Sequence, residues 1–309
     1  MPPRQTEQEQ EDFARALRSV AEESALPQEE IDALSLLEGD DLERFRPVWA
    51  ALPAGARARL VRTLHSAAEQ RLRLDFSAVN HLALRDDDPE VRLAGVQAAI
   101  EDRSPALLDA LLEMVQSDPD TDVRHAAAED LARFTLLAEL DDLDVELTAR
   151  LRSRLQAVVQ DERQAPRIRA SALAALGYFS DADTAERLAA SFSDPQLRPG
   201  AVRGMGRSAD PRWTDRLMPV LGSDDPQLRV EAARALGEIE DERAVTPLVE
   251  VIDDPVREVR LAVIDALGHI GGEEAREALL YVAEDPDDEV RAAAERALED
   301  IEAVEEDEL

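Results

Sequence analysis

Residues 225–237 read DPQLRVEAARALG, and this stretch decides how the chain folds. Asp225 is a good N-cap, because its carboxylate accepts hydrogen bonds from the first backbone N–H groups of a helix. Pro226 follows at the first helical position, where a missing N–H costs nothing. The apolar side chains then fall on one stripe at helical spacing: Leu228, Ala232, Ala235 and Leu236. The segment therefore predicts an amphipathic helix.

The same pattern returns along the chain with a period near 30 residues. The dipeptide Asp-Pro begins at Asp88, Asp118, Asp194, Asp225, Asp254 and Asp285. An aliphatic-Arg pair and an alanine-rich run follow each time, and a seventh copy follows Ala165-Pro166. We number the aliphatic residue as position one: Val91, Val123, Ile168, Leu197, Leu228, Val259 and Val290. Such self-similarity is typical of a solenoid of stacked units. We expect an all-α chain of about eight helical hairpins, each closed by a tight turn.

Small residues recur at two positions of the predicted second helix of each unit. Position five is small throughout, which lets neighbouring helices approach closely: Gly95, Ala127, Ala172, Ala201, Ala232, Val263 and Ala294. Position ten is glycine in four copies, near the predicted helix end: Gly177, Gly206, Gly237 and Gly268. Because glycine adopts conformations closed to other residues, we expect these four to let the backbone turn out of the helix.

The pattern resembles the HEAT repeat family, and more closely its short bacterial and archaeal form, which is also found in phycobilisome (bilin) lyases. The matching features are the Asp-Pro turns, the Val-Arg pairs at 259–260 and 290–291, and Ala-Leu-Gly at 175–177, 235–237 and 266–268. The resemblance covers about residues 75 to 300. It implies a right-handed α-solenoid whose second helices line a concave surface.

The ends of a solenoid differ from its middle, because the terminal units must cover an apolar face. We expect a helical cap over residues 1–40, with Phe13, Leu17, Ile31 and Leu34 buried. The repeats should fill 41–301, including a degenerate first unit and an acidic insert near 139–144 that lengthens one connection. Residues 302–309 are almost wholly acidic and predict a frayed tail.

Composition excludes several function classes. The chain has a net charge of −34, its 35 basic residues are all Arg, and it has no Cys. The charge makes nucleic acid and anionic membranes unlikely partners, and the lack of Cys excludes disulfides and thiolate metal sites. No secretory signal or membrane span is evident, so we expect a cytoplasmic monomer. A high-salt or GC-rich source explains the charge better than selection for a basic partner does, since net charge bears mainly on solubility and association.

The most regular charged feature is an Arg at position two of every unit. In the HEAT resemblance such an Arg pairs with turn acids, which implies a structural ladder here. Its predicted members are Asp88, Arg92, Asp118, Arg124, Arg169, Asp194, Arg198, Asp225, Arg229, Asp254, Arg260, Asp285 and Arg291. A row of anion-binding guanidinium groups is the functional alternative.

Positions seven and eleven lie one turn apart, away from the apolar stripe, and would face the groove if the resemblance holds. Across seven units they carry five Arg and five carboxylates. The hypothesised contact residues for a protein ligand are Tyr178, Arg203, Arg207, Arg234 and Asp265. The cluster around the three Arg residues could be locally positive and suit an acidic peptide, although a mixed-charge face can also be simply solvated.

Nothing in the sequence predicts catalysis, a metal or a cofactor. Deoxyhypusine hydroxylases are HEAT-like and hold two irons with His-Glu dipeptides, but His65, His81, His125 and His269 are followed by Ser, Leu, Ala and Ile. Two of these, His65 and His125, have Glu four residues later, which is more typical of a surface contact than of a metal site. We therefore expect a non-catalytic scaffold that binds an extended protein or peptide. A lyase or isomerase acting on a tetrapyrrole-protein conjugate remains the alternative from the resemblance.

Overall fold

The computed structural model describes residues 7–71 and 73–307. The described residues form eighteen α-helices and three short 3-10 helices, without a β-strand. The all-α prediction is confirmed. Among the described residues, no helix combines the length and apolar character that crossing a bilayer requires. Residues 1–6 of the expected cap and 308–309 of the expected tail lie outside the described residues.

The chain divides into two compact units, residues 1–131 and 132–309. The boundary falls within helix α8 (Thr121–Glu139). The other helices of the first unit are α1 (Glu7–Ala21), α2 (Gln28–Ala33), α3 (Gly39–Ala51), α4 (Ala54–Gln70), α5 (Ser77–Ala83), α6 (Pro89–Ala98) and α7 (Pro105–Ser117). After α2, successive helices pair as the hairpins that the sequence period predicts.

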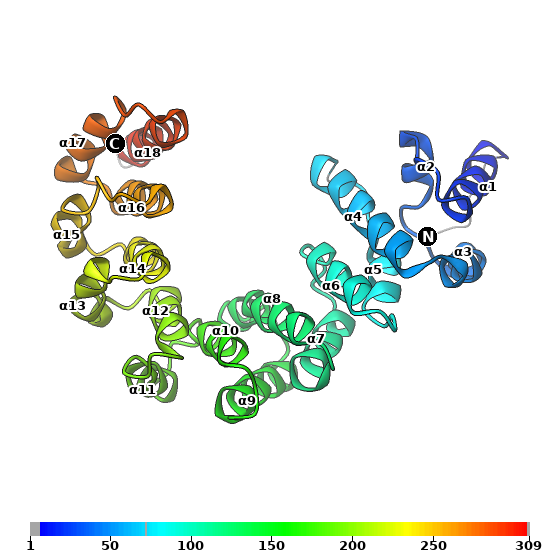
Figure 1. The fold of residues 1–309 in the computed structure, drawn as a ribbon, viewed down its shortest axis with the longest axis horizontal. Coiled ribbons are helices and arrows are strands. Elements are labelled where there is room, and N and C mark those ends of the chain that lie inside the picture. Colours follow the sequence, from blue (N-terminus) through cyan, green and yellow to red (C-terminus); the bar gives the residue numbers. More distant parts are fainter. Residues whose placement is uncertain (1–6, 72, 308–309) are drawn as a thin grey trace. The chain divides into compact units, whose positions relative to one another are not determined.

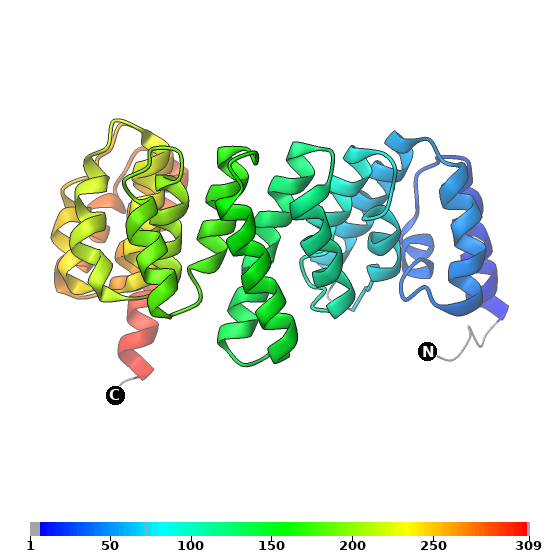
Figure 2. The same ribbon diagram turned by 90° about the horizontal axis from the view of Figure 1, so that it is seen from below.

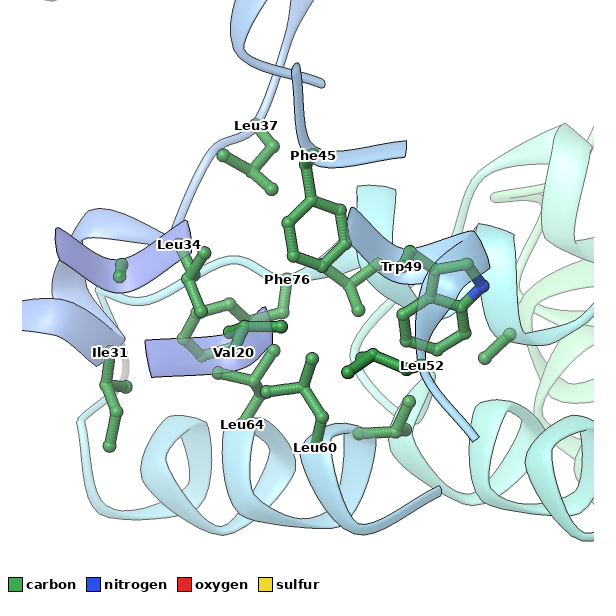
Figure 3. Packing of buried hydrophobic residues seen from close by; sticks show 14 of the residues in the cluster. Val20, Ile31, Leu34, Leu37, Phe45, Trp49, Leu52, Leu60, Leu64 and Phe76 are labelled. Atoms are coloured by element: carbon green, nitrogen blue, oxygen red, sulfur yellow. The ribbon is translucent and has the colours of Figure 1, made fainter. Parts of the chain in front are cut away.

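The N-terminal end of the first unit is closed by a continuous apolar cluster. Helix α1 packs on α2 and α3. Phe13, Ile31 and Leu34 are buried there, as expected, and Leu17 is partly buried against them. Figure 3 shows Phe45 and Trp49 of α3 meeting Leu60 and Leu64 of α4 in the same cluster. Phe13, Ile31 and Leu34 of the cap therefore cover the apolar face that this first repeat would otherwise expose.

The second unit is a double row of helices. Its members after α8 are α9 (Val145–Gln160), α10 (Pro166–Leu176), α11 (Ala182–Ser191), α12 (Arg198–Arg207), η1 (Pro211–Trp213), α13 (Thr214–Leu217), η2 (Met218–Gly222), α14 (Pro226–Ile239), η3 (Glu242–Ala244), α15 (Val245–Val249), α16 (Arg257–Ile270), α17 (Glu273–Val282) and α18 (Asp288–Asp307). Within this unit, α10, α12, α14, α16 and α18 stack in order as one row, and α11, α13, α15 and α17 form the other (Figure 1). The first row contains the second helix of every hairpin.

Each Asp-Pro turn is held by the same hydrogen bond. The aspartate carboxylate accepts from the backbone N–H two residues later at 2.7–3.0 Å, and the six acceptors are Asp88, Asp118, Asp194, Asp225, Asp254 and Asp285. Asp88 and Asp225 are the N-caps of α6 and α14. Where the helix begins later, another residue takes that place: Asp120 caps α8 with its carboxylate, whereas α12 and α16 begin after Leu197 and Val256 without a side-chain cap. The motif therefore builds the turn in all six copies and is the N-cap itself in two.

The recurring glycines at position ten serve a different purpose from the one expected. None of the four has a positive φ, so the prediction that they turn the backbone out is wrong. Each instead packs against position eight of the next second helix. A Cβ would lie 2.6 Å from Ala235 Cα at Gly206, 2.8 Å from Ala266 Cα at Gly237, and 2.8 Å from Ala297 Cβ at Gly268. Glycine is needed here because two backbones approach closely.

Two further expectations about helix ends need correction. Helix α18 runs to Asp307, so residues 302–307 continue a helix instead of fraying. Glu is a good helix former, and extending an existing helix is easier than starting one. The acidic insert does not lengthen a loop: only Leu140–Asp144 connect α8 and α9. The extra residues lengthen the two helices, which have 19 and 16 residues.

Candidate functional site

The Arg at position two fastens the turn that precedes its own helix. In six units its guanidinium donates to the backbone carbonyl six residues earlier, at 2.6–3.0 Å; these are Arg92, Arg124, Arg198, Arg229, Arg260 and Arg291. Arg169 donates instead to Val159 O at 2.8 Å, because its turn is built around Ala165-Pro166 without the Asp. The arginines at position two thus donate hydrogen bonds to oxygen atoms of this chain.

Two of these arginines also join adjacent units by paired hydrogen bonds. Arg92 contacts both carboxylate oxygens of Asp118 at 2.7 and 2.8 Å, and Arg229 contacts those of Asp254 at 2.8 and 2.9 Å. The hydrogen bonds raise the pKa of both guanidinium groups. Burial raises the pKa of Asp254, but the bonds from Arg229 and the Val256 N–H outweigh it, and the net pKa is lowered. Both pairs are largely buried, which favours a structural role over anion binding.

The residues at positions seven and eleven surround a hollow in the second unit. Its volume is about 470 Å³. The lining residues come from the turn after α10, from α12 and the turn after it, from α14 and its C-cap, and from α16: Tyr178, Gly206, Arg207, Ala209, Arg234, Glu238, Glu240, Asp265 and His269. Four of the five predicted contact residues are therefore brought together by successive second helices. The fifth, Arg203, lies one turn earlier on α12, with its Nε 3.9 Å from Oε2 of Glu231.

Close packing of the second helices shapes this hollow. Arg207 lies over the Tyr178 ring, with its Cζ 5.3 Å from the ring centroid, a cation–π arrangement. The floor is Gly206, where a Cβ would meet both the Ala235 backbone and the carboxylate of Glu238. The glycine that lets α14 approach α12 therefore also leaves room for the Glu238 side chain.

The electrostatics of the hollow differ from the expectation of a positive patch. Its lining has two guanidinium groups, Arg207 and Arg234, against the carboxylates of Glu238, Glu240 and Asp265. The locally positive cluster predicted around Arg203, Arg207 and Arg234 does not form here, because Glu231 lies beside Arg203 and Glu240 joins Glu238 and Asp265 in the lining. The surface is instead one of alternating charge.

Glu238 is the most perturbed acid of the hollow. Its pKa is raised, first by desolvation among the surrounding side chains and then by the charge of Glu231, while Arg207, Arg234 and His269 act in the opposite direction. The Glu238 side chain is exposed to solvent, so its desolvation comes from protein atoms packed beside the carboxylate and not from burial in a closed cavity. His269 contacts Asp265 O through Nδ1 at 2.8 Å, which ties the two residues together on α16.

Sequence reasoning found some of the lining and missed the rest for identifiable reasons. Glu238 and His269 occupy position eleven, so the repeat numbering places them in the row even though they were not among the chosen contacts. Glu240 was missed because it enters the hollow as the C-cap of α14 in a left-handed conformation, with φ 55°. Left-handed non-glycine residues carry little sequence signal. Ala209, with φ 48°, was missed for the same reason.

The histidines lie in separate surroundings. His65 Nε2 is 3.7 Å from Oε1 of Glu69, and His81 Nε2 is 2.8 Å from Oδ2 of Asp102. Burial raises the pKa of Asp102, but hydrogen bonds from His81 and Ser104 outweigh it and bring the pKa to about 2. Within the described residues, no three His, Asp or Glu side chains gather as a metal-binding group.

Comparison with known families agrees with this repeat geometry. A family model of HEAT repeats matches residues 54–132, 77–164, 190–262 and 214–299, which together span more than half of the chain. The chain belongs to the HEAT repeat family. The match is to HEAT repeats in general and does not extend to the phycobilisome lyase subtype.

Several solved structures are similar to parts or most of this HEAT repeat chain. Importin beta is 15% identical with a TM-score of 0.48, over 95% of this chain and 47% of its own. An engineered protein is 21% identical with a TM-score of 0.38, over 96% of both chains. Human deoxyhypusine hydroxylase is 20% identical with a TM-score of 0.34, over 74% of this chain and 96% of its own. At such low identities these likenesses carry nothing about function. No curated protein sequence matches the chain.

Proposed function

We propose that this HEAT repeat protein is a non-catalytic scaffold that binds an extended protein segment along the second helices of its C-terminal unit. The observation that carries the proposal is the hollow of about 470 Å³, to which the turn after α10 and the helices α12, α14 and α16 each contribute at positions seven or eleven of their repeats. Such a row presents several weak contacts at regular intervals along one ligand, so their free energies add.

The arginines that line the hollow differ from the ladder arginines at the turns in the ion pairs that they form. The ladder arginines donate to carbonyls or carboxylates of the chain. Arg207 and Arg234 form no ion pair with any residue in the part of the chain that the structure describes, and Arg234 is exposed. Their donors are therefore accessible to a ligand without first breaking an internal salt bridge, which would cost binding energy.

The alternating charges of the hollow define the kind of segment that fits. Arg207 and Arg234 are complementary to acidic side chains, whereas Glu238 and Asp265 are complementary to basic ones. The Tyr178 ring adds an amphipathic contact, a residue type enriched at protein interfaces. A segment with both acidic and basic side chains fits this lining better than the purely acidic one suggested by the sequence.

Site-specific photo-crosslinking tests the proposal. A photoreactive amino acid at position 234 should crosslink a partner in cells, and mass spectrometry would identify the bound segment. The matched control is position 163, another Arg of the second unit, with 90% of its side chain exposed. The identified segment, made as a peptide, should bind at least about tenfold more weakly to the Arg207→Glu/Arg234→Glu variant than to wild type.

The control variant Arg163→Glu should retain close to wild-type affinity for the same peptide, because Arg163 does not line the hollow. Equal affinity of the peptide for wild type and for the double reversal would show that the row is not the binding surface. A loss in both variants that scales with the number of charges reversed would show that only the overall charge matters.

A further inference from the structure

Three large apolar side chains are exposed at the tip of the hairpin between α8 and α9. Their exposed fractions are 37% for Leu136, 61% for Leu140 and 82% for Val145. Leu136 lies in the last turn of α8, Leu140 directly follows the helix, and Val145 is the first residue of α9. An isolated exposed Leu needs no explanation, but three large apolar side chains exposed within ten positions concentrate apolar surface at one hairpin tip, and concentrated apolar surface marks interaction sites.

The tip extends beyond its neighbours. Helix α8 has 19 residues, whereas α14 has 14. At 1.5 Å per residue, the difference amounts to about 7 Å. Figure 2 shows the loop joining α8 to α9 beyond the ends of α10 and α12. The apolar residues therefore lie on the most accessible part of these hairpins, away from the row of second helices that forms the hollow.

The charge around the tip has one sign. Between Arg133 and Arg150 the sequence contains no basic residue, and the acids there are Glu139, Asp141, Asp142, Asp144 and Glu146. All five are exposed. The apolar patch is thus bordered by carboxylates, and a complementary surface needs cationic groups around an apolar centre.

The backbone of the tip is held in place without a ligand. Asp142 N donates to Leu137 O at 2.8 Å and closes the end of α8. Asp144 caps α9 by accepting from Glu146 N at 2.8 Å. The Ser180 hydroxyl donates to Glu139, which anchors the hairpin to the turn after α10. A partner would therefore not have to order this loop on binding.

We propose that the α8–α9 tip docks into a partner protein whose surface has an apolar pocket bordered by Arg or Lys. Leu140 and Val145 would fill the pocket, and the carboxylates would pair at its rim. The charge of the tip distinguishes between the possible binding partners. An anionic membrane and a second copy of this chain, with its net charge of −34, are both repelled by the acidic tip.

A synthetic amphipathic helical peptide of Leu and Arg provides a probe, because its Leu stripe is bordered by Arg. Binding to the full chain is measured by fluorescence anisotropy, with a second peptide that has Ser in place of Leu. The Leu140→Ser/Val145→Ser variant should bind the Leu/Arg peptide at least about tenfold more weakly than wild type. The Ser/Arg peptide should bind wild type and variant equally, since the charges are unchanged.

The matched control is Leu280→Ser/Tyr281→Ser, which removes two apolar side chains of α17 that are 54% and 64% exposed. Its affinity for the Leu/Arg peptide should stay within about twofold of wild type. Equal weakening in both variants, or none in either, overturns the proposal. Tip-dependent dimerisation in sedimentation, or tip-dependent binding to anionic phosphatidylglycerol vesicles, overturns the assignment to a basic protein partner. Thermal unfolding by circular dichroism should be the same for all variants.

Discussion

Replacing Gly200 by Ala should destabilise the second unit, although the same change in an exposed helix stabilises a protein. A Cβ at Gly200 would lie 2.6 Å from Ala170 Cα and 2.7 Å from Ala170 C, where ordinary contact begins at 3.4 Å. Backbone atoms cannot rotate aside as a side chain can. Helices α12 and α10 would therefore have to separate by about 1 Å, at an overpacking cost of about 3 kcal/mol. The higher helix propensity of Ala offsets about 1 kcal/mol, which leaves about 2 kcal/mol of net destabilisation.

Urea unfolding followed by tryptophan fluorescence measures this change. The chain has two Trp, of which Trp49 lies in the first unit and Trp213 in the second, so a Trp49→Phe background makes the signal specific to the second unit. With an m value of about 3 kcal/mol/M, the midpoint should fall by about 0.7 M. The control is Gly222→Ala, because a Cβ there meets nothing within 4 Å and the backbone φ is not positive. An unchanged or higher midpoint for Gly200→Ala would refute the close-packing argument.

Three more predictions follow from the charged groups. Arg92→Ala should cost about 3 kcal/mol in urea unfolding, because it leaves the buried Asp118 carboxylate without its partner; Arg163→Ala, on an exposed pair, should leave the midpoint unchanged. Asp102 has a pKa lowered to about 2, so its stabilisation is complete above about pH 4 and is lost toward pH 2. The stability difference between wild type and Asp102→Asn should accordingly shrink by about 2 kcal/mol over that range, and a constant difference would contradict the role of its hydrogen bonds. Glu238 has a raised pKa, so its ionisation destabilises the fold as pH rises. Glu238→Gln should therefore unfold at higher urea than wild type at pH 7, with the gain disappearing near pH 4.

The hairpins could be predicted because the signals that build them are local. The Asp-Pro turn is closed by a hydrogen bond between residues two apart, and the apolar stripe follows the helical period. The positions of four lining residues could be predicted from the sequence for a related reason. A fixed repeat length brings equivalent positions of successive second helices, such as Arg207 and Glu238, to one side of the row.

The glycines show where such reasoning fails. The residues around Gly206 in the sequence fit either role of a glycine, ending a helix or allowing a neighbouring helix to pack closely. Only the close approach of Ala235 in the structure shows that the second role applies. The charge of the hollow was misjudged for the same reason. Counting side chains on a helical stripe omits Glu231, which lies beside Arg203, and Glu240, which enters from a helix cap.

The sequence by itself determined the repeating hairpin and the residues of its turns, since both depend on contacts between residues close along the chain. The family follows from the same repeated pattern. Tertiary structure alone decided the lining and charge of the hollow, the purpose of the glycines and the exposure of Leu140 and Val145. These properties depend on which atoms of neighbouring helices meet, and the distance between two helix axes is set by packing across the whole interface, which no short-range pattern records.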